Sequence, residues 1–239
     1  MLHTNNYPLF FMLSHASGSA YHYVEAYREL ADKVKLLPLE LSGHGKRRLD
    51  RLLYTLDEIV EDLFVQAKKH LGEGEDKDYY IFGHSMGALN AFLLSTRMVK
   101  AGIKAPKRLF VSSYSVPGWH PIPKGMTLLS NLDMWRLSAE RFGVLNNEPI
   151  PTEEQMELFS EVYRADLISV ENFKGLDPVP VLDALITAVF AENDMVDYNL
   201  VKDWRNFTSR DLEIIMVEGG HFHPLERPLQ LEKIILERL

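Results

Sequence analysis

The alternation of short apolar runs with longer amphipathic segments constrains the fold of this chain more than any other feature. The runs that read as β-strands lie at 8–14, 34–40, 78–85, 107–114, 182–192 and 211–220. Segments with apolar residues at helical spacing lie at 21–32, 55–71, 86–102, 197–207 and 226–239. Strands that alternate with helices form a mostly parallel central sheet with helices on both faces. The sequence therefore predicts an α/β fold.

The alternation stops between residues 117 and 178. No run in this stretch reads as a strand, whereas the segments near 126–142 and 152–172 have helical spacing. Strand-like runs resume afterwards, so we interpret 117–178 as a helical insertion and not as a second domain. A length of 239 residues is within the range of one α/β domain, and we expect a single domain over residues 1–239.

The composition argues against several classes of function. The formal net charge of −8 disfavours a nucleic-acid partner, because binding phosphates needs clustered cations. The chain has no cysteine, which excludes disulfides, thiolate metal sites and cysteine nucleophiles. No apolar run approaches the roughly 18 residues of a membrane span, and the N-terminus lacks the basic region of a signal peptide. We therefore expect a cytoplasmic protein that does not bind a membrane. Separately, we expect a monomer.

The sequence Gly83-His84-Ser85-Met86-Gly87 stands between a strand-like run and a helical segment. This pattern is typical of a nucleophile elbow, in which a sharp strand-to-helix turn exposes a serine hydroxyl and the glycines allow close packing. The five-residue pattern alone arises by chance in roughly one chain in twenty, so the argument depends on its context. The alternative is a tight turn with an idle serine. The context predicts that Ser85 is a nucleophile.

A serine nucleophile needs a base, and in this kind of fold the chain order is serine, then an acid, then histidine. Gly219-Gly220-His221 follows the last strand-like run, so His221 is predicted to lie at the same sheet edge as Ser85. The two glycines would let the backbone turn tightly into the site. His223 is the rival base, two residues further on. The pair of histidines has no further ligands at metal spacing, and we predict no metal site.

The acid is expected after the strand that ends near Ala191. Glu192, Asp194 and Asp197 are the candidates. Asp194 lies in the turn just past the strand end, where a carboxylate could hold the imidazole in the required tautomer. The alternative is that Asp194 only forms the turn, since Asn-Asp pairs favour turns.

Acyl transfer also needs two N–H donors for the oxyanion of the tetrahedral intermediate. One is expected from Met86, the residue after the nucleophile, and the other from an early loop. Residues 14–18, Ser-His-Ala-Ser-Gly, follow the first strand and are small enough for a close backbone approach. The alternative is a plain connecting loop.

A basic run follows the second strand. Lys46, Arg47 and Arg48 would lie on the same sheet edge and could contact an acidic partner, although charge runs are more often solvated faces.

Four large side chains of the insertion have two possible uses. Trp119, Met126, Met134 and Trp135 either line an apolar acyl channel or pack the insertion against the core.

Six ordered segments together resemble one known family, the type II thioesterases that accompany nonribosomal peptide synthetases and polyketide synthases. The segments are SHASGSA (14–20), ELSGHGKR (40–47), FGHSMGAL (82–89), KRLFVSSYSVP (107–117), YRADL (163–167) and GGHFH (219–223). They span nearly the whole chain. The resemblance implies an α/β-hydrolase fold in which 117–178 is a lid over the active site.

The resemblance also implies roles for single residues. Ser85, Asp194 and His221 would form the catalytic triad, and the amides of Ala16 and Met86 would bind the oxyanion. Such enzymes hydrolyse acyl groups from the phosphopantetheine thiol of acyl or peptidyl carrier proteins, chiefly to clear stalled or incorrect chains. They need no cofactor, because the phosphopantetheine arm belongs to the substrate.

The chain departs from the usual family pattern at three serines. Ser14 and Ser42 stand where proline is usual, and Ser17 stands where glycine is usual. The serine at position 17 is expected to stiffen the loop that provides the second oxyanion donor.

Two other readings use the same residues. A carboxylester hydrolase would act on small-molecule esters, and the relative rates on acyl-carrier protein and on simple esters would separate it from a thioesterase. A catalytically silent protein of the same fold would only bind partners. The joint presence of Ser85, Asp194 and His221 argues against the silent protein.

Overall fold

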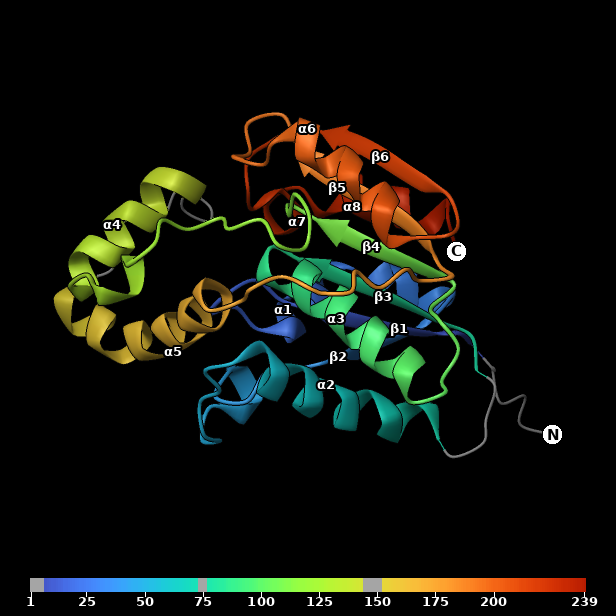
Figure 1. Ribbon diagram of the computed structural model, residues 1–239, viewed down its shortest axis with the longest axis horizontal. Helices are drawn as coiled ribbons and strands as arrows, with labels where there is room; N and C mark the ends of the chain where they lie inside the picture. Colours follow the sequence, from blue (N-terminus) through green and yellow to red (C-terminus); the bar gives the residue numbers. More distant parts are fainter. Residues whose placement is uncertain (1–6, 73–76, 144–151) are drawn as a thin grey trace.

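The central element of the fold is a six-stranded parallel sheet (Figure 1). The computed structural model describes residues 7–72, 77–143 and 152–239. The strands are β1 (Leu9–Leu13), β2 (Lys35–Pro38), β3 (Tyr79–His84), β4 (Arg108–Ser112), β5 (Leu185–Ala191) and β6 (Leu212–Val217). Their order is β2-β1-β3-β4-β5-β6, and every neighbouring pair is parallel. All six strands and the α/β class agree with the prediction from the sequence.

The order of the strands reverses between β1 and β3. From β1 the chain moves outward to β2, and it then returns to place β3 on the other side of β1. In open parallel sheets, the loops at the carboxyl ends of the strands form the binding crevice at such a reversal. The fold therefore directs attention to the loops that follow β1 and β3.

Helices cover both faces of the sheet because successive strand residues point to opposite sides. On β1, Phe11 faces a cluster that includes α2 (Leu56–Leu71) and α3 (Met86–Lys100). Its neighbour Phe10 faces a second cluster that includes α1 (Ala20–Ala26) and α8 (Pro228–Leu236). Both phenylalanines are fully buried.

Three predicted elements are divided in the structure. The segment predicted as a helix at 21–32 forms α1 and the 3₁₀ helix η1 (Arg28–Asp32). The predicted helix at 197–207 forms α6 (Tyr198–Val201) and the 3₁₀ helix η5 (Lys202–Phe207), and that at 226–239 forms α7 (His223–Glu226) and α8. The last break has a local cause: Arg227, with φ −134°, precedes Pro228, and a residue before proline avoids the helical region.

The segment between β4 and β5, at 117–178, contains the predicted helices. They are the short 3₁₀ helix η3 (Met126–Leu128), α4 (Asn131–Phe142) and α5 (Glu153–Glu171). In Figure 1, α4 and α5 lie beyond the ends toward which the arrowheads of β4 and β6 point. This inserted segment has a small apolar cluster of its own, made by Ile122, Met126, Met134, Tyr163 and Leu167. Residues 144–151 of this segment lie outside the described ranges. Residues 1–6, part of the N-terminus that was predicted to carry no signal peptide, also lie outside them.

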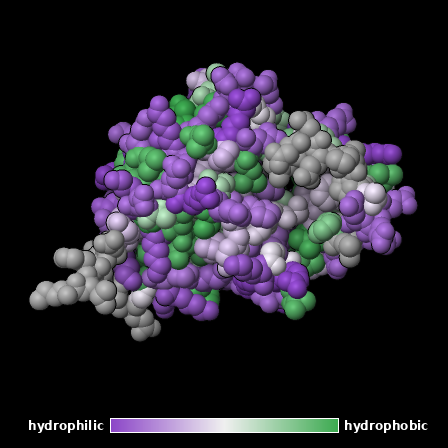
Figure 2. Space-filling model, turned by 180° about the vertical axis from the view of Figure 1, so that it is seen from behind, coloured by the Kyte–Doolittle hydropathy of each residue, from purple (hydrophilic) through white to green (hydrophobic). Residues whose placement is uncertain are grey.

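The exterior is mixed in polarity. On the face seen in Figure 2, hydrophobic residues appear as separate areas among hydrophilic ones. None of the helices in the described ranges combines the length and the apolarity that crossing a bilayer requires.

Candidate active site

Ser85 lies on the sharp turn between β3 and α3. Its backbone has φ +54° and ψ −123°, which is a strained conformation for a residue with a side chain. A Cβ atom on Gly83 would lie 2.0 Å from the Gly87 carbonyl oxygen, and one on Gly87 would lie 2.4 Å from the Ser14 carbonyl oxygen. Both glycines are therefore required for the strand, the helix and the loop after β1 to meet at this turn.

Ser85, His221 and Asp194 form one hydrogen-bonded chain at the carboxyl edge of the sheet. The Ser85 Oγ atom lies 3.0 Å from Nε2 of His221, and Nδ1 of His221 lies 2.9 Å from Oδ1 of Asp194. A carboxylate only accepts, so Nδ1 carries the proton and Nε2 is left to accept the serine proton. The three residues follow β3, β5 and β6, as the sequence predicted.

The rival residues lie elsewhere. Glu192 and Asp197 are exposed, and Asp197 caps α6 by accepting the Asn199 N–H at 2.8 Å. The Nε2 atom of His223 lies 3.2 Å from the Ser112 hydroxyl. The choice of Asp194 and His221 over these candidates is therefore supported by the geometry.

Asp194 is held as a carboxylate. Its side chain has 0% exposure, and burial by itself would raise its pKa. The hydrogen bond and the charge of His221 outweigh burial and lower the pKa. This side chain is therefore suited to balance a positive charge that forms on the imidazole.

The backbone before His221 has the tight turn expected from its glycines. Gly219 has φ +117°, a conformation that side chains rarely allow. A Cβ atom on Gly220 would meet no atom within 4 Å, so only one of the two glycines is sterically required.

Further histidines surround His221 and are neutral. Burial lowers the pKa of His15 to about 3, that of His223 to about 4, and that of His84 well below its usual value. The ring centre of His84 lies 5.1 Å from that of His221. Within the described ranges, no group of three histidine, aspartate or glutamate side chains is arranged to hold a metal.

A small apolar cavity of about 60 Å³ opens beside Ser85. Ala16 and Met86, the two predicted oxyanion donors, contribute to its wall. Phe142, at the end of α4, places its ring centre 4.8 Å from that of His221, so the inserted segment covers the imidazole. The other lining residues are His15, Tyr114, Pro121, Ile122, Tyr163, Leu167, Val170 and Phe222.

The four large side chains predicted either to line a channel or to pack are used for packing. None of Trp119, Met126, Met134 and Trp135 is among the residues that line the cavity at Ser85. Met126 and Met134 are buried in the cluster of the inserted segment. Trp135 stacks on Tyr163 with ring centres 4.7 Å apart, and Trp119 packs against the main core.

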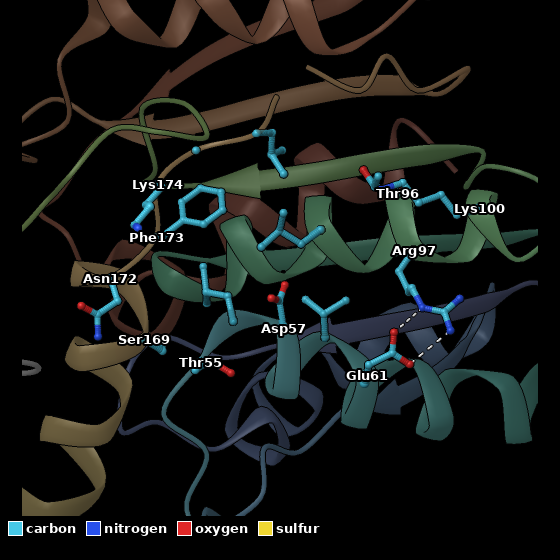
Figure 3. Close-up of a pocket in the computed structure, with 15 residues that line it drawn as sticks. Thr55, Asp57, Glu61, Thr96, Arg97, Lys100, Ser169, Asn172, Phe173 and Lys174 are labelled. Atoms are coloured by element: carbon cyan, nitrogen blue, oxygen red, sulfur yellow. Dashed lines mark hydrogen bonds and ion pairs between the residues drawn. The ribbon is translucent and has the colours of Figure 1, made fainter. Parts of the chain in front are cut away.

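A larger groove of about 520 Å³ lies away from Ser85, between α2, α3 and the end of α5 (Figure 3). Its walls combine apolar and polar side chains, and Arg97 of α3 pairs across it with Glu61 of α2. Ser169 and Val170 are neighbours on α5, but Ser169 lines this groove and Val170 lines the cavity at Ser85. The end of α5 therefore separates the two spaces.

The three cations of the basic run after β2 have different surroundings. Arg47 donates to Asp62 and Asp50 and is half-buried, so it is a structural residue. Lys46 places its Nζ atom 3.8 Å from the centre of the Tyr21 ring, and Arg48 is exposed. Lys46 and Arg48 therefore remain as possible partner contacts.

Two residues that join the inserted segment to the loops beside the site were not predicted from the sequence. Asp166 of α5 accepts the Ser17 N–H at 2.7 Å, and its Oδ2 atom lies 2.9 Å from Nε2 of His44. Both side chains are buried. The signal that the sequence offers for them is their place in the YRADL and LSGHG segments of the family resemblance.

Known proteins resemble this chain over most of its length. A family model described as thioesterase domain matches residues 8–238. Thioesterase PikA5 of Streptomyces venezuelae is 27% identical over 214 residues, which cover 88% of this chain and 73% of that protein. The structure of ClbQ from the colibactin NRPS/PKS pathway has a TM-score of 0.87 at 26% identity and covers 96% of this chain and 95% of its own. The type II thioesterase BorB from the borrelidin biosynthetic cluster has a TM-score of 0.85 at 28% identity, with coverage of 99% and 94%. These matches confirm the predicted α/β-hydrolase fold.

Proposed function

Because this chain belongs to the thioesterase domain family, we propose that it is a type II thioesterase of nonribosomal peptide or polyketide biosynthesis. It hydrolyses acyl groups from the phosphopantetheine thiol of acyl or peptidyl carrier proteins and so clears stalled or incorrect chains. The observation that carries the proposal is the hydrogen-bonded chain from Ser85 through His221 to Asp194. The similarity to ClbQ and BorB supports the choice of pathway.

The first half of the reaction acylates the enzyme. His221 accepts the proton of Ser85 through Nε2 while Oγ attacks the thioester carbonyl, and Asp194 stabilises the imidazolium that forms. The oxyanion is bound by the backbone N–H groups of Met86 and Ala16. The tetrahedral intermediate then collapses, and the pantetheine thiolate leaves with the proton returned by His221.

The second half releases the acid. Water donates a proton to Nε2 of His221 as its oxygen attacks the acyl-serine carbonyl, and the same two amides bind the second oxyanion. Collapse of this intermediate breaks the bond to Oγ, and the proton returns to Ser85. The inserted segment at 117–178 acts as the lid, since Phe142 covers the imidazole.

The reaction needs no metal and no diffusible cofactor, because the phosphopantetheine arm is part of the substrate. The carrier protein is the partner, and we expect the enzyme to act as a cytoplasmic monomer. Lys46 and Arg48 are the cations of the run after β2 that remain available to an acidic carrier protein.

The rates on two substrates with the same acyl group test the function. We expect the butanoyl thioester of a holo-carrier protein to be hydrolysed with a higher kcat/KM than 4-nitrophenyl butanoate. A large preference for the free ester would favour a carboxylester hydrolase. A Ser85→Ala variant should fold normally and lose turnover, because the hydroxyl is used for chemistry. Turnover that persists in this variant would contradict the role of Ser85 as the nucleophile.

Charge reversal tests the docking of the carrier protein. The double variant Lys46→Glu and Arg48→Glu should raise the KM for acyl-carrier protein and reduce its dependence on salt, while the rate on the free ester is unchanged. The double variant Lys68→Glu and Lys69→Glu is the matched control, because both lysines are exposed near the far end of α2. Equal effects of both changes would contradict a docking role.

A further inference from the structure

Asp166 of α5 joins the inserted segment to two loops at the carboxyl edge of the sheet. One oxygen, Oδ2, accepts the Ser17 N–H at 2.7 Å and lies 2.9 Å from Nε2 of His44. Asp166 is 2% exposed and His44 is 4% exposed, so bulk water does not compete for these contacts. Because a single oxygen serves the loop after β1 and the loop after β2, a displacement of α5 would disturb both.

The contacts of Asp166 and His44 favour a charged pair. Nδ1 of His44 lies 3.0 Å from the Ser42 carbonyl oxygen, which can only accept, so Nδ1 carries a proton. A second proton on Nε2 then completes the contact with the carboxylate. Burial lowers the pKa of His44, but the hydrogen bond and the charge of Asp166 outweigh burial and raise it. Oδ2 of Asp166 faces two donors, which suits an ionised oxygen, and hydrogen bonds to ionised acceptors are roughly twice as strong as neutral ones.

The Ser17 N–H that Asp166 holds belongs to a strained residue. Ser17 has φ +61°, and a left-handed conformation costs a residue with a side chain about 1–2 kcal/mol. Two further contacts fix the same loop: the Gly18 N–H donates to the His15 carbonyl oxygen at 3.0 Å, and the Ser14 hydroxyl donates to the Gly18 carbonyl oxygen at 3.0 Å. The loop is thus held in one conformation from several sides.

Ala16 lies between these fixed points. It lines the same cavity as Ser85, and its N–H has no acceptor among the protein groups of the described ranges. We propose that Asp166 is a positioning residue for acyl transfer: by holding the Ser17 N–H, it directs the neighbouring Ala16 amide toward the oxyanion. A complete oxyanion site therefore requires that α5 lies where Asp166 can reach the Ser17 N–H. The inference rests on the proposed function, in which the Ala16 amide is one of the two donors.

Two substitutions at position 166 in the full-length protein test this role. Removal of an entire oxyanion donor lowers kcat about 10²–10³-fold, so Asp166→Ala, which only displaces one, should lower kcat about 30-fold. Asp166→Asn keeps an oxygen that can accept the Ser17 N–H but loses the charge, and its kcat should fall about 3- to 10-fold. The KM should change little in either variant, because the substrate does not contact Asp166.

Glu171 provides a matched control on the same helix. Its carboxylate accepts the Gly125 N–H and the Thr127 hydroxyl, and both partners lie within the inserted segment. Glu171→Ala therefore removes a similar carboxylate-to-loop contact without touching residues 14–18. We expect its kcat to stay within about twofold of the wild-type value, even if its thermal midpoint falls.

Binding of a trifluoromethyl ketone distinguishes positioning from a merely structural role. Ser85 adds to the ketone of 1,1,1-trifluoro-2-pentanone and forms a tetrahedral oxyanion. The affinity of the enzyme for this ketone should therefore fall together with kcat/KM in both Asp166 variants. The inference is overturned if affinity is unchanged while kcat falls, or if both variants behave like Glu171→Ala. If Asp166→Ala does not fold, Asp166→Asn serves as the test, because asparagine has a similar volume to aspartate. A wild-type kcat in Asp166→Asn would then overturn the inference.

Each variant is assayed with 4-nitrophenyl butanoate and with S-butanoyl pantetheine. Both substrates pass through the same oxyanion, so the loss in kcat should be similar for the two. If the wild-type protein hydrolyses only the free ester, the proposed thioesterase function fails, and the ester rates still decide the role of Asp166. A loss confined to the thioester would overturn the role of Asp166, because it would concern the leaving group and not the oxyanion.

Discussion

Replacing Asp194 by asparagine tests whether this side chain acts through the imidazole of His221. The Asp194 side chain is fully buried, with Oδ1 2.9 Å from Nδ1 of His221, while Nε2 lies 3.0 Å from Ser85 Oγ. An amide has nearly the same shape as a carboxylate. The substitution should therefore preserve the fold and change only the charge and the donor or acceptor that faces Nδ1.

The size of the effect follows from the two orientations of the amide. If its NH₂ group faces Nδ1 of His221, the imidazole must carry its proton on Nε2 and cannot accept a proton from Ser85. A wrong tautomer of this kind lowers kcat about 10⁴-fold, or about 5.5 kcal/mol. If its oxygen faces Nδ1, the tautomer is correct but the imidazolium has no buried counter-charge. A charged hydrogen bond exceeds a neutral one by about 1–1.5 kcal/mol, so kcat then falls about tenfold.

The assay is the steady-state kcat for hydrolysis of S-butanoyl pantetheine, with thermal unfolding as the check on the fold. Asp194→Asn should lower kcat by at least about tenfold and at most about 10⁴-fold. Glu192→Gln and Asp197→Asn are the controls, because both carboxylates are exposed and an asparagine can still cap α6. A kcat for Asp194→Asn that matches the wild-type value, or an equal loss in Asp197→Asn, would refute the reasoning.

Three further predictions concern packing and pH. Gly87→Ala should lower the free energy of unfolding by about 1–3 kcal/mol, because its Cβ would lie 2.4 Å from the backbone that follows β1. Gly220→Ala is the control and should be nearly neutral, because its Cβ would meet no atom within 4 Å. Equal free energies of the two variants in urea unfolding would contradict the steric argument. Met134→Ala should destabilise the protein by about 2–4 kcal/mol without changing the preferred acyl length, because Met134 is buried and does not line the cavity at Ser85. Leu167 lines this cavity, so Leu167→Ala should shift activity toward longer acyl chains. Rates on a series of thioesters of increasing chain length measure both effects. Burial lowers the pKa of His223 to about 4 from 6.5, so the unfolded chain binds more protons between these values. Stability should therefore fall as the pH decreases through this window, by up to about 3 kcal/mol from His223 alone, and buried His15 and His84 act in the same direction. A flat profile in urea unfolding would contradict this.

The strands and the three hydrogen-bonded residues could be predicted because their signals are local. Each strand is a short apolar run, and the places of Ser85 and His221 follow from glycines beside a strand end. In a parallel sheet, the carboxyl ends of all strands lie at one edge. Residues that follow these ends are therefore predicted to lie close together from the topology alone. The same reasoning located Asp194 in the turn after β5.

Other features depend on contacts between distant segments. Asp166 and Ser17 are separated by 149 positions, and nothing in the spacing of either segment indicates the other. The break at Tyr27 accompanies full burial of that side chain, whose hydroxyl donates to the Pro224 carbonyl oxygen. Arg47 is structural only because α2 places Asp62 beside it. Tertiary packing decides each of these outcomes, and local patterns do not contain it.

The strained backbone of the site shows how such distant contacts support its chemistry. Within the described ranges, the non-glycine residues with left-handed φ values are Ser17, Ser85 and Ser113, and they follow β1, β3 and β4. The N–H of each is fixed by another element: Asp166 accepts from Ser17, a carbonyl of β4 accepts from Ser85 at 2.8 Å, and a carbonyl of β5 accepts from Ser113 at 2.9 Å. Strained conformations persist only where their surroundings determine them. Two of these anchors are sheet carbonyls that no side-chain substitution removes, whereas the third is a side chain on the inserted segment. The geometry at the loop after β1 is therefore the part of the site that depends on the position of α5.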